Sequence, residues 1–286
     1  MRHKLAGLKQ AAFLPTLLVV VPPSIIGFLI ANNFSVGMLL LLILAVALWD
    51  ISANVLNNYA DWEIDVKNGK RQKMHMHISK NELLAAFAGF LLGSFAVIVL
   101  LLRPSAYFYV FYGLEVLLAV WYSMHVTLKD KLVVNYAAIA LAYGLFSFLM
   151  GYFAVGSSLQ GMLYSLPVGL FLGLLYFGIT IVKDYGDIEG DRAHNKKTLP
   201  IHIGKGRTLS VQYTVISIAY ALLLLFIALG VVSPVLLISL PFYFTVMLML
   251  SQISKTSDPT RLRNISFYTQ INTFFMGIAI MLVLLL

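Results

Sequence analysis

Two short stretches, residues 57–65 and 183–191, hold most of the groups in this chain that could do chemistry. They read Asn-Asn-Tyr-Ala-Asp-Trp-Glu-Ile-Asp and Lys-Asp-Tyr-Gly-Asp-Ile-Glu-Gly-Asp, so Tyr, Asp, Glu and Asp recur at the same places, 126 residues apart. Seven of the twelve acidic residues of the chain lie in these stretches. Because most of the remaining sequence is apolar, we expect the functional site here.

The oxygen-bearing side chains of each stretch are spaced three or four residues apart, which places them on one face of a helix. The predicted metal ligands are Asn57, Asp61, Asp65, Asp184, Asp187 and Asp191. Like charges stacked on one helix face repel each other unless a cation lies against them. Carboxylates suit Mg²⁺, which keeps several waters and is typically held by one or two carboxylates together with substrate phosphates. Two facing clusters could therefore hold Mg²⁺ ions with a diphosphate between them, whereas the alternative is a pair of solvated acidic loops.

Basic residues flank both stretches and could hold a diphosphate beside the metal ions. The flanking residues are Lys67, Lys70, Arg71, Lys73, Lys183, Arg192, Lys196 and Lys197. Among them we predict that Lys67, Arg71, Lys183 and Lys197 bind the diphosphate, and we favour Arg71 and Lys197. The positive charge expected at the cytoplasmic face of a membrane protein explains most of these residues equally well.

The elements that position these groups are predicted to be membrane-spanning helices. Apolar residues make up 60% of the 286 residues and charged residues only 11%, against about 25% charged residues in soluble domains. We therefore expect an all-α membrane protein forming a single domain, residues 1–286, because backbone polar groups have no water to bond in lipid. The nine predicted spans are 11–31, 37–58, 81–102, 105–125, 132–153, 160–183, 209–230, 233–252 and 264–286. Pro22 and Pro23 should kink or break the first span, and the absence of cysteine excludes disulfides and thiolate sites.

The distribution of Lys and Arg predicts the orientation of the spans. If the N-terminus is cytoplasmic, nineteen of the twenty basic residues lie on that side and only Arg103 lies opposite. Both acidic stretches then lie on the cytoplasmic face of a multi-pass protein of the cell membrane, in the long connections 59–80 and 184–208. The net charge of +8 is explained in this way without a nucleic-acid partner.

The constant offset between the two stretches predicts an internal duplication. Residues 11–125 would correspond to residues 132–252, with the last helix, 264–286, as an addition. Four spans is an even number, so the two halves would have the same orientation.

The Asn-x3-Asp-x3-Asp pattern of the first stretch and Asp187-x3-Asp191 in the second resemble the paired aspartate signature of the UbiA superfamily of intramembrane prenyltransferases. The run that follows, residues 192–204, is also similar to that family, and the nine spans match over nearly the whole chain. The resemblance implies a helical bundle around a central cavity, capped by cytoplasmic connections and open sideways to lipid.

The resemblance also implies an activity, the Mg²⁺-dependent transfer of an isoprenyl group from a diphosphate to a lipophilic acceptor. Asn57, Asp61 and Asp65 would hold one Mg²⁺, and Asp187 and Asp191 the other, with Asp184 assisting. In such a reaction the departing diphosphate is stabilised by metal ions and cations, and the allylic carbocation must be kept from water. The family often has a Tyr followed by a Lys after the fourth span, which would be Tyr122 and Lys129, although their spacing here is longer. Lys129 would then join the residues that bind the diphosphate. The predicted catalytic residues are Asp61, Asp65, Asp187, Asp191 and Tyr122.

The acceptor is less well defined by the sequence. Asn135 and residues 151–156 resemble the archaeal lipid branch, which makes digeranylgeranylglyceryl phosphate, so geranylgeranyl diphosphate and geranylgeranylglyceryl phosphate are the favoured substrates. After Asp65, however, the prolines found in many relatives are absent. An aromatic acceptor of quinone or tocopherol type is therefore the alternative, and the oligomeric state is open.

Two further acidic residues, Asp50 and Glu115, lie inside predicted spans, where acidic side chains are costly and suggest function. Asp50 could line the cavity or orient a metal ligand, and Glu115 could bond a neighbouring helix. A divalent-cation transporter with acids along its path is the competing function of another class. A CDP-alcohol phosphotransferase would also place aspartates at a membrane face, but its single dense motif is absent.

Overall fold

The structure is a computed structural model that describes residues 2–31, 34–67, 71–124, 126–155, 158–193 and 196–286. A few side chains within these ranges, including that of Lys67, lie outside the description.

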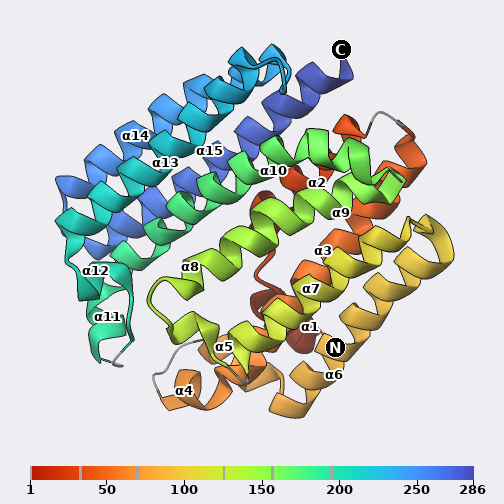
Figure 1. Cartoon of the computed structure of the whole chain (residues 1–286). Helices are drawn as coiled ribbons and strands as arrows, with labels where there is room; N and C mark the ends of the chain where they lie inside the picture. Colours follow the sequence, from red (N-terminus) through yellow and green to blue (C-terminus); the bar gives the residue numbers. More distant parts are fainter. Residues whose placement is uncertain (1, 32–33, 68–70, 125, 156–157, 194–195) are drawn as a thin grey trace.

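Within the described ranges, nine helical segments are long and apolar enough to cross a membrane (Figure 1). They are His3–Ile30, Val36–Ala60, Lys80–Leu102, Ala106–Ser123, Val134–Val155, Leu159–Gly186, Lys205–Ala228, Pro234–Ser254 and Pro259–Leu285. Each predicted span overlaps one of these segments, and no strand occurs in the described part of the chain. The predicted all-α membrane fold is therefore confirmed.

The spans are built from helices that are interrupted in places. The α-helices are α1 Arg2–Ala12, α2 Leu17–Ile30, α3 Val36–Ala60, α4 Trp62–Lys67, α5 Gln72–His77, α6 Lys80–Ala96, α7 Ala106–Ser123, α8 Val134–Ile139, α9 Ser147–Val155, α10 Leu159–Thr180, α11 Ile188–Ala193, α12 Leu199–His202, α13 Lys205–Ala228, α14 Leu240–Ser254 and α15 Pro259–Leu285. Two π-helical segments, Val97–Leu102 and Ala140–Phe146, lie within the third and fifth spans.

The first span is interrupted before its two prolines rather than at them. Phe13 has a left-handed backbone, with φ of 41°, and a short turn then leads from α1 into α2. The helix α2 continues through Pro22 and Pro23, so a break at these residues is wrong, while a kink there stays a prediction. Prolines are tolerated inside membrane helices where neighbouring groups satisfy the freed backbone. Here Tyr176 of α10 donates a hydrogen bond to the carbonyl oxygen of Val19, at 2.6 Å.

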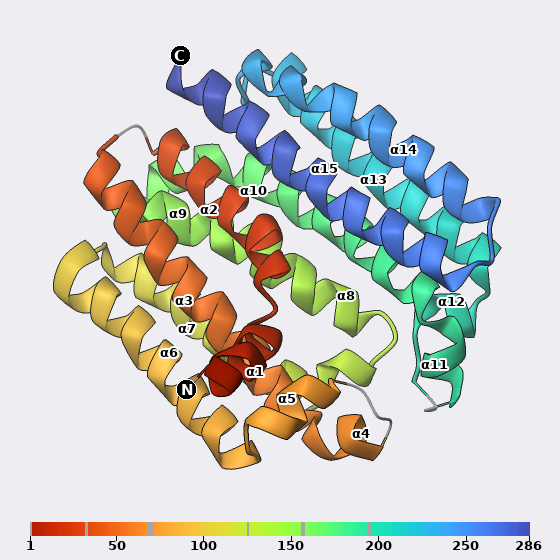
Figure 2. The same ribbon diagram turned by 180° about the vertical axis from the view of Figure 1, so that it is seen from behind.

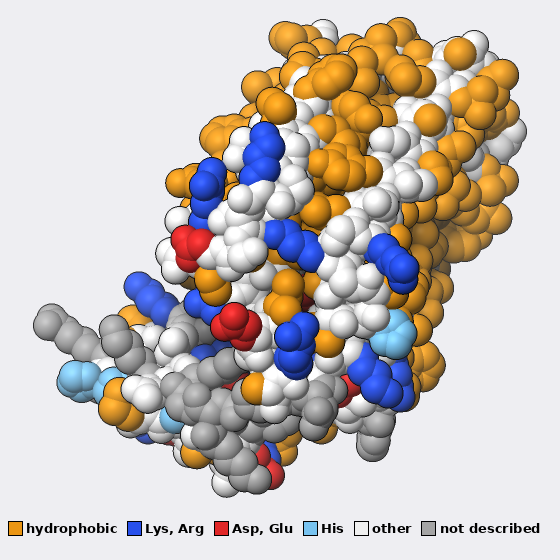
Figure 3. All heavy atoms as spheres, turned by 90° about the vertical axis from the view of Figure 1, so that its left-hand side faces the viewer, with side chains coloured by type: hydrophobic (Ala, Val, Ile, Leu, Met, Phe, Trp, Pro, Cys, Tyr) orange, Lys and Arg blue, Asp and Glu red, His pale blue; other side chains and the backbone are white. Residues whose placement is uncertain are grey.

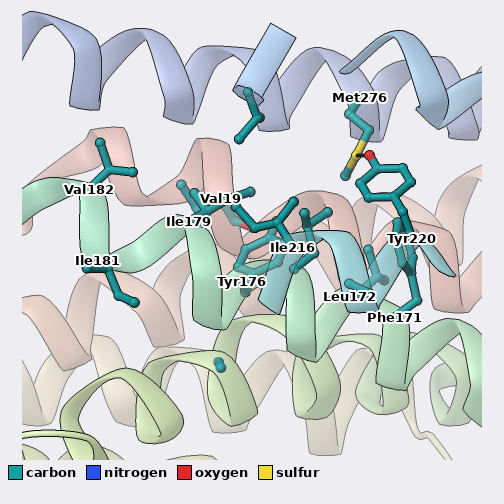
Figure 4. Close-up of a cluster of buried hydrophobic side chains, with 14 of the residues drawn as sticks. Val19, Phe171, Leu172, Tyr176, Ile179, Ile181, Val182, Ile216, Tyr220 and Met276 are labelled. Atoms are coloured by element: carbon teal, nitrogen blue, oxygen red, sulfur yellow. Dashed lines mark hydrogen bonds between the residues drawn. The ribbon is translucent and has the colours of Figure 1, made fainter. Parts of the chain in front are cut away.

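The helix α2 lies at the centre of the bundle, where it packs against α3, α9 and α15. Its contact with α9 is close because Gly27 and Gly151 have no side chain to separate the two backbones. The largest buried cluster joins α2 to α10, α13 and α15 (Figure 4). At one end of this cluster, Tyr220 lies beside Met276 and donates a hydrogen bond to the carbonyl oxygen of Ser239. These contacts join the four helices in one continuous buried core.

Both acidic stretches lie at the same end of the molecule, which we call the motif end. The short helices α4 and α5 and the short helices α11 and α12 occupy this end, whereas the C-terminus lies at the other (Figures 1 and 2). In the view of Figure 3, charged side chains and histidines gather toward the motif end, and the rest of that face is mainly apolar. This common location is what the predicted shared site requires. The side of the membrane on which the motif end lies remains a prediction.

We expect Gly151→Ala to destabilise the fold, because the added methyl group would collide with the carbonyl oxygen of Ser24 on α2. Overpacking of this kind costs about 1–3 kcal/mol. Gly113→Ala is the matched control, since its methyl group would meet no atom within 4 Å among the described residues. Thermal unfolding in detergent tests the prediction, and equal midpoints for the two variants would contradict it.

Candidate active site

The two acidic stretches have the same local structure. In each, a span ends, one aspartate follows, and a helix of six residues begins. The short helices α4 and α11 start at Trp62 and Ile188 and end at Lys67 and Ala193, so both their ends are 126 residues apart. The backbone N–H of Asp65 donates to the carbonyl oxygen of Asp61 at 2.9 Å, and that of Asp191 to the carbonyl oxygen of Asp187 at 2.8 Å.

These backbone bonds keep each pair of aspartates one helical turn apart, as their spacing predicts. The repeated sequence therefore adopts a repeated local structure, while duplication of the two whole halves remains a prediction.

The carboxylate of Asp61 is paired with a cation from a distant connection. The Nζ atom of Lys129, in the turn between α7 and α8, lies 2.6 Å from Oδ1 of Asp61 and 3.3 Å from Oδ1 of Asn57. Lys129 thus contacts two of the three predicted metal ligands of the first stretch. This position agrees with its predicted place in the site.

Asp65 is paired with a cation from the connection that follows it. Its Oδ2 atom lies 2.6 Å from Nη1 of Arg71, and its carboxylate is largely buried. Arg71 has a left-handed backbone, with φ of 51°, just before α5. His75 of α5 lies nearby, and burial lowers its pKa despite the opposing effect of Asp65. An ion pair between Arg71 and Asp65 therefore ties the first stretch to its capping helix.

The second stretch has two ion pairs of its own. Lys196 lies 3.1 Å from Oδ1 of Asp191, and Arg263 of α15 lies 2.9 Å from Oδ1 of Asp187. Partial burial acts to lower the pKa of Lys196, but Asp191, with smaller contributions from Asp61 and Asp184, raises it above its ordinary value. Because Lys196 interacts with Asp61 as well as Asp191, the two stretches share one electrostatic environment.

Asp184 faces the protein interior. Its carboxylate accepts a hydrogen bond of 2.5 Å from the hydroxyl group of Tyr136 on α8. The same hydroxyl accepts a hydrogen bond of 3.1 Å from the backbone N–H of Leu199, at the start of α12. Tyr136 therefore links α8 to the end of the sixth span, which contains Asp184, and to the start of α12. Asp184 thus has a structural role.

A cavity of about 300 Å³ begins at the motif end and extends into the bundle. Asn57, Arg71 and Lys183 line it beside the acidic stretches. Tyr122 lines it as well, and its hydroxyl donates a hydrogen bond of 2.8 Å to Oδ1 of Asn135. Farther along the spans, the lining residues include Trp49, Asp50, Ala53, Asn54, Glu115, Leu118, Ala119, Ala142 and Tyr143. The cavity therefore combines a charged opening with a mostly apolar interior that contains two acidic groups.

The structure brings together most of the residues predicted for the site, but not all. The first stretch, Arg71, Lys129 and Lys183 meet at the opening, with Tyr122 on the cavity wall. Lys197 is exposed and has no ion pair or hydrogen bond to any described residue, and the side chain of Lys67 lies outside the described part.

Two cations at the site were not selected from the sequence. Lys196 is next to the favoured Lys197 and is the one of the two that contacts an aspartate, while the role of Lys197 toward the diphosphate stays a prediction. Arg263 belongs to the last span, and no spacing rule connects it with Asp187.

The oxygen donors at the opening fit Mg²⁺. They are carboxylates and one amide, with no thiolate or imidazole among them, and Mg²⁺ prefers oxygen. Among the described residues, no three His, Cys, Asp or Glu side chains are close enough to enclose a cation by themselves. Such an open donor set suits an ion that completes its coordination with water and substrate phosphates.

The comparison with known families decides the family of the chain. The model of the UbiA prenyltransferase family matches residues 20–283. The chain belongs to this family. As a UbiA prenyltransferase it is an enzyme that transfers an alkyl group, which confirms the predicted class and disfavours the transporter and the phosphotransferase.

Individual relatives of this UbiA prenyltransferase come from archaea. The chain is 32% identical over 201 residues to the digeranylgeranylglyceryl phosphate synthase of Methanoregula boonei, covering 69% of this chain and 68% of that protein. It is also 32% identical over 159 residues to the synthase of the same name from Methanothermobacter thermautotrophicus, covering 54% and 51% of the two chains.

Solved structures confirm the fold at lower identity. A UbiA homolog from Archaeoglobus fulgidus bound to GPP and Mg²⁺ has a TM-score of 0.73 at 18% identity, over 96% of this chain and 99% of that one. The apo UbiA homolog from Aeropyrum pernix K1 has a TM-score of 0.71 at 19% identity, over 93% of this chain and 97% of that one.

Tyr136→Phe should destabilise the second stretch, because it leaves the buried carboxylate of Asp184 without its hydroxyl donor. We expect a loss of about 1–3 kcal/mol in the free energy of unfolding. Tyr164→Phe is the matched control, since Tyr164 is exposed on α10 and has no hydrogen bond within the described part of the chain. Denaturation in detergent measures both variants, and equal stabilities would show that this hydrogen bond is unimportant.

Proposed function

We propose that this UbiA prenyltransferase transfers an isoprenyl group from an isoprenyl diphosphate to a lipophilic acceptor, with Mg²⁺ as cofactor. The observation that carries the proposal is the meeting of two acidic stretches and their cations at the opening of one membrane cavity. A diphosphate at the opening would be bound by charges, and its isoprenyl chain would lie in the cavity or in lipid.

The oxygen donors have distinct roles in this proposal. Asn57, Asp61 and Asp65 would hold one Mg²⁺, and Asp187 and Asp191 the other. The bound ions would neutralise the charge that develops on the diphosphate as it departs. Asp184 would support this arrangement through its bond to Tyr136 rather than as a primary ligand.

The cations of the site would change partners when substrate binds. In the structure, four of the five aspartates of the two stretches are each paired with a lysine or arginine, namely Lys129, Arg71, Lys196 and Arg263. A carboxylate that binds a metal ion no longer needs such a partner. The released cation can then bind a phosphate oxygen, which is a strong charge-assisted contact. Lys183, which lines the cavity beside them, would act on the same diphosphate.

The cavity interior would protect the allylic carbocation that forms when the diphosphate leaves. Apolar side chains such as Leu118 and Ala119 keep water away, and water would otherwise quench the cation. The faces of Tyr122 and Trp49, which also line the cavity, could stabilise positive charge through their π-electrons. We assign Tyr122 to this role because its hydroxyl is already engaged with Asn135.

The favoured substrates are geranylgeranyl diphosphate and geranylgeranylglyceryl phosphate. The support for this pair comes from the two relatives named digeranylgeranylglyceryl phosphate synthase. An aromatic acceptor of quinone or tocopherol type is the alternative. Acceptors of both kinds carry a hydroxyl group on a lipophilic body.

The proposed activity can be measured with purified protein in bilayers, labelled geranylgeranyl diphosphate and each candidate acceptor. We expect product only with Mg²⁺, and a loss of about 100-fold or more in Asp61→Asn and in Asp187→Asn, by analogy with the loss of other groups that stabilise charge in a transition state. The matched control is Glu63→Gln, because Glu63 belongs to the same stretch but is exposed and paired with Lys80. Product formed in the presence of a chelator, or an equal loss in Glu63→Gln, would refute the assignment.

Lys196 and Lys197 provide a second test, because they are adjacent but only Lys196 contacts an aspartate of the site. We expect Lys196→Met to raise the KM for the isoprenyl diphosphate by about 10-fold or more, as expected for a lost hydrogen bond to a charged group. Lys197→Met should change this KM by less than about 3-fold, as expected for an exposed charge. Steady-state kinetics measure the KM of both variants. A larger rise in KM for Lys197→Met than for Lys196→Met would contradict the assignment of Lys196 to the diphosphate.

A further inference from the structure

Two acidic side chains line the cavity far from the motif end and take no part in the site described above. Asp50 of α3 and Glu115 of α7 are each only 1% exposed, and both border the cavity. They are close enough to influence each other electrostatically. Acidic groups at such a depth are costly in a membrane protein and call for a partner.

One oxygen atom of each carboxyl group is held by neighbouring side chains. Oδ2 of Asp50 accepts hydrogen bonds from Thr16, at 2.5 Å, and from Asn54, at 3.2 Å. Oε1 of Glu115 accepts a hydrogen bond of 3.0 Å from Ser147. These bonds fix the orientation of both carboxyl groups at the cavity wall.

The other oxygen atom of each carboxyl group lies within hydrogen-bond distance and angle of no described donor, although Tyr143 interacts with the carboxyl group of Asp50 and Trp49 with that of Glu115. These atoms are Oδ1 of Asp50 and Oε2 of Glu115, and both are buried. A buried acceptor without a donor is destabilising. An isoprenyl chain has no donor to offer, so filling this part of the cavity with hydrocarbon would leave both atoms unpaired. A hydroxyl group of a ligand would give one of these atoms its missing donor, and two hydroxyl groups would satisfy both.

The position of Asp50 relative to the acidic stretch fits a ligand that reacts at the opening. Asp50 precedes Asn57 by seven residues on α3, which is about 10 Å along the helix axis. The reacting atoms must lie about 3–3.5 Å apart. A head group that reacts at the opening through one hydroxyl must therefore extend about 10 Å to bond Asp50 through another. Tyr143, which faces the same region, lies on the π-helical segment Ala140–Phe146, and such segments often occur at functional sites.

We infer that Asp50 and Glu115 form the acceptor-binding part of the cavity and accept hydrogen bonds from hydroxyl groups of the acceptor head group. The acceptor class that fits is a lipophile with hydroxyl groups besides the one that reacts, and with no negative charge at this depth. A phosphate group on the acceptor would have to remain near the cations of the motif end, because two carboxyl groups would repel it here. This inference rests on the proposed prenyl transfer and names the chemistry of its second substrate.

Asp50→Asn and Glu115→Gln test the inference while retaining shape. In Asp50→Asn the amide oxygen can keep the bonds from Thr16 and Asn54, and in Glu115→Gln it can keep the bond from Ser147. The amide NH₂ group then takes the position of the free oxygen. The free position then changes from an acceptor to a donor. We expect the acceptor KM to rise by about 10-fold or more, with the KM for the isoprenyl diphosphate within about 2-fold of its original value. An acceptor analogue with a carbonyl group in place of the hydroxyl should inhibit both variants more strongly than the unaltered enzyme.

The matched control is Ser94→Ala, which removes a buried hydroxyl that donates to the carbonyl oxygen of Ala45 on α3 but does not border the cavity. Its acceptor KM should be unchanged. The inference is overturned if Asp50→Asn and Glu115→Gln keep the original acceptor KM and the original response to the carbonyl analogue. Failure of the proposed function would look different, because the unaltered enzyme would then form no product with any acceptor.

Discussion

The arrangement of this molecule depends on the compensation of charge at the motif end. Four aspartates are concentrated beside a membrane cavity, and each is paired with a cation. The partners come from four different connections or spans, so the requirement for compensation draws together parts of the chain that are distant in sequence. The carboxylates of Asp65 and Asp191 are buried, where an unpaired charge is costly, whereas the pair of Asp187 and Arg263 is largely exposed. The pairs of Asp65 and Asp191 therefore stabilise the connections over the cavity, and all four pairs keep a cation close to where the diphosphate would bind.

The interrupted helices explain how a membrane bundle can present these groups. A continuous span would carry its last carboxylates past the cavity, whereas a stop followed by a six-residue helix keeps them at its edge. Both acidic stretches have this stop and six-residue helix, 126 residues apart in the sequence. Interruptions deeper in the bundle act differently, because the π-helical segment Ala140–Phe146 belongs to the wall that faces Asp50 and Glu115. The charged opening and the proposed acceptor region thus both lie where regular helix is modified.

The sequence was sufficient for the spans and the common location of the acids, since long apolar runs and basic connections depend on local composition. It was insufficient where tertiary contacts decide the outcome. Arg263 reaches Asp187 because the last span packs beside the sixth, and Lys196 rather than Lys197 points to Asp191 because of the local shape of one loop. The break expected at Pro22 is absent because the neighbouring helices support α2 there. The free oxygen atoms of Asp50 and Glu115 depend on four different elements and could not be derived from spacing.

The central claim is that the two acidic stretches bind one diphosphate through Mg²⁺, and calorimetric titration of Mg²⁺ tests it most directly. The claim predicts weak Mg²⁺ binding to the protein alone, because the carboxylates are occupied by cations and do not enclose an ion by themselves. A non-reactive isoprenyl diphosphate analogue should strengthen Mg²⁺ binding by about 10-fold or more, and Mg²⁺ should strengthen binding of the analogue by the same factor, as linkage requires. Mg²⁺ affinity that is unchanged by the analogue would contradict the claim.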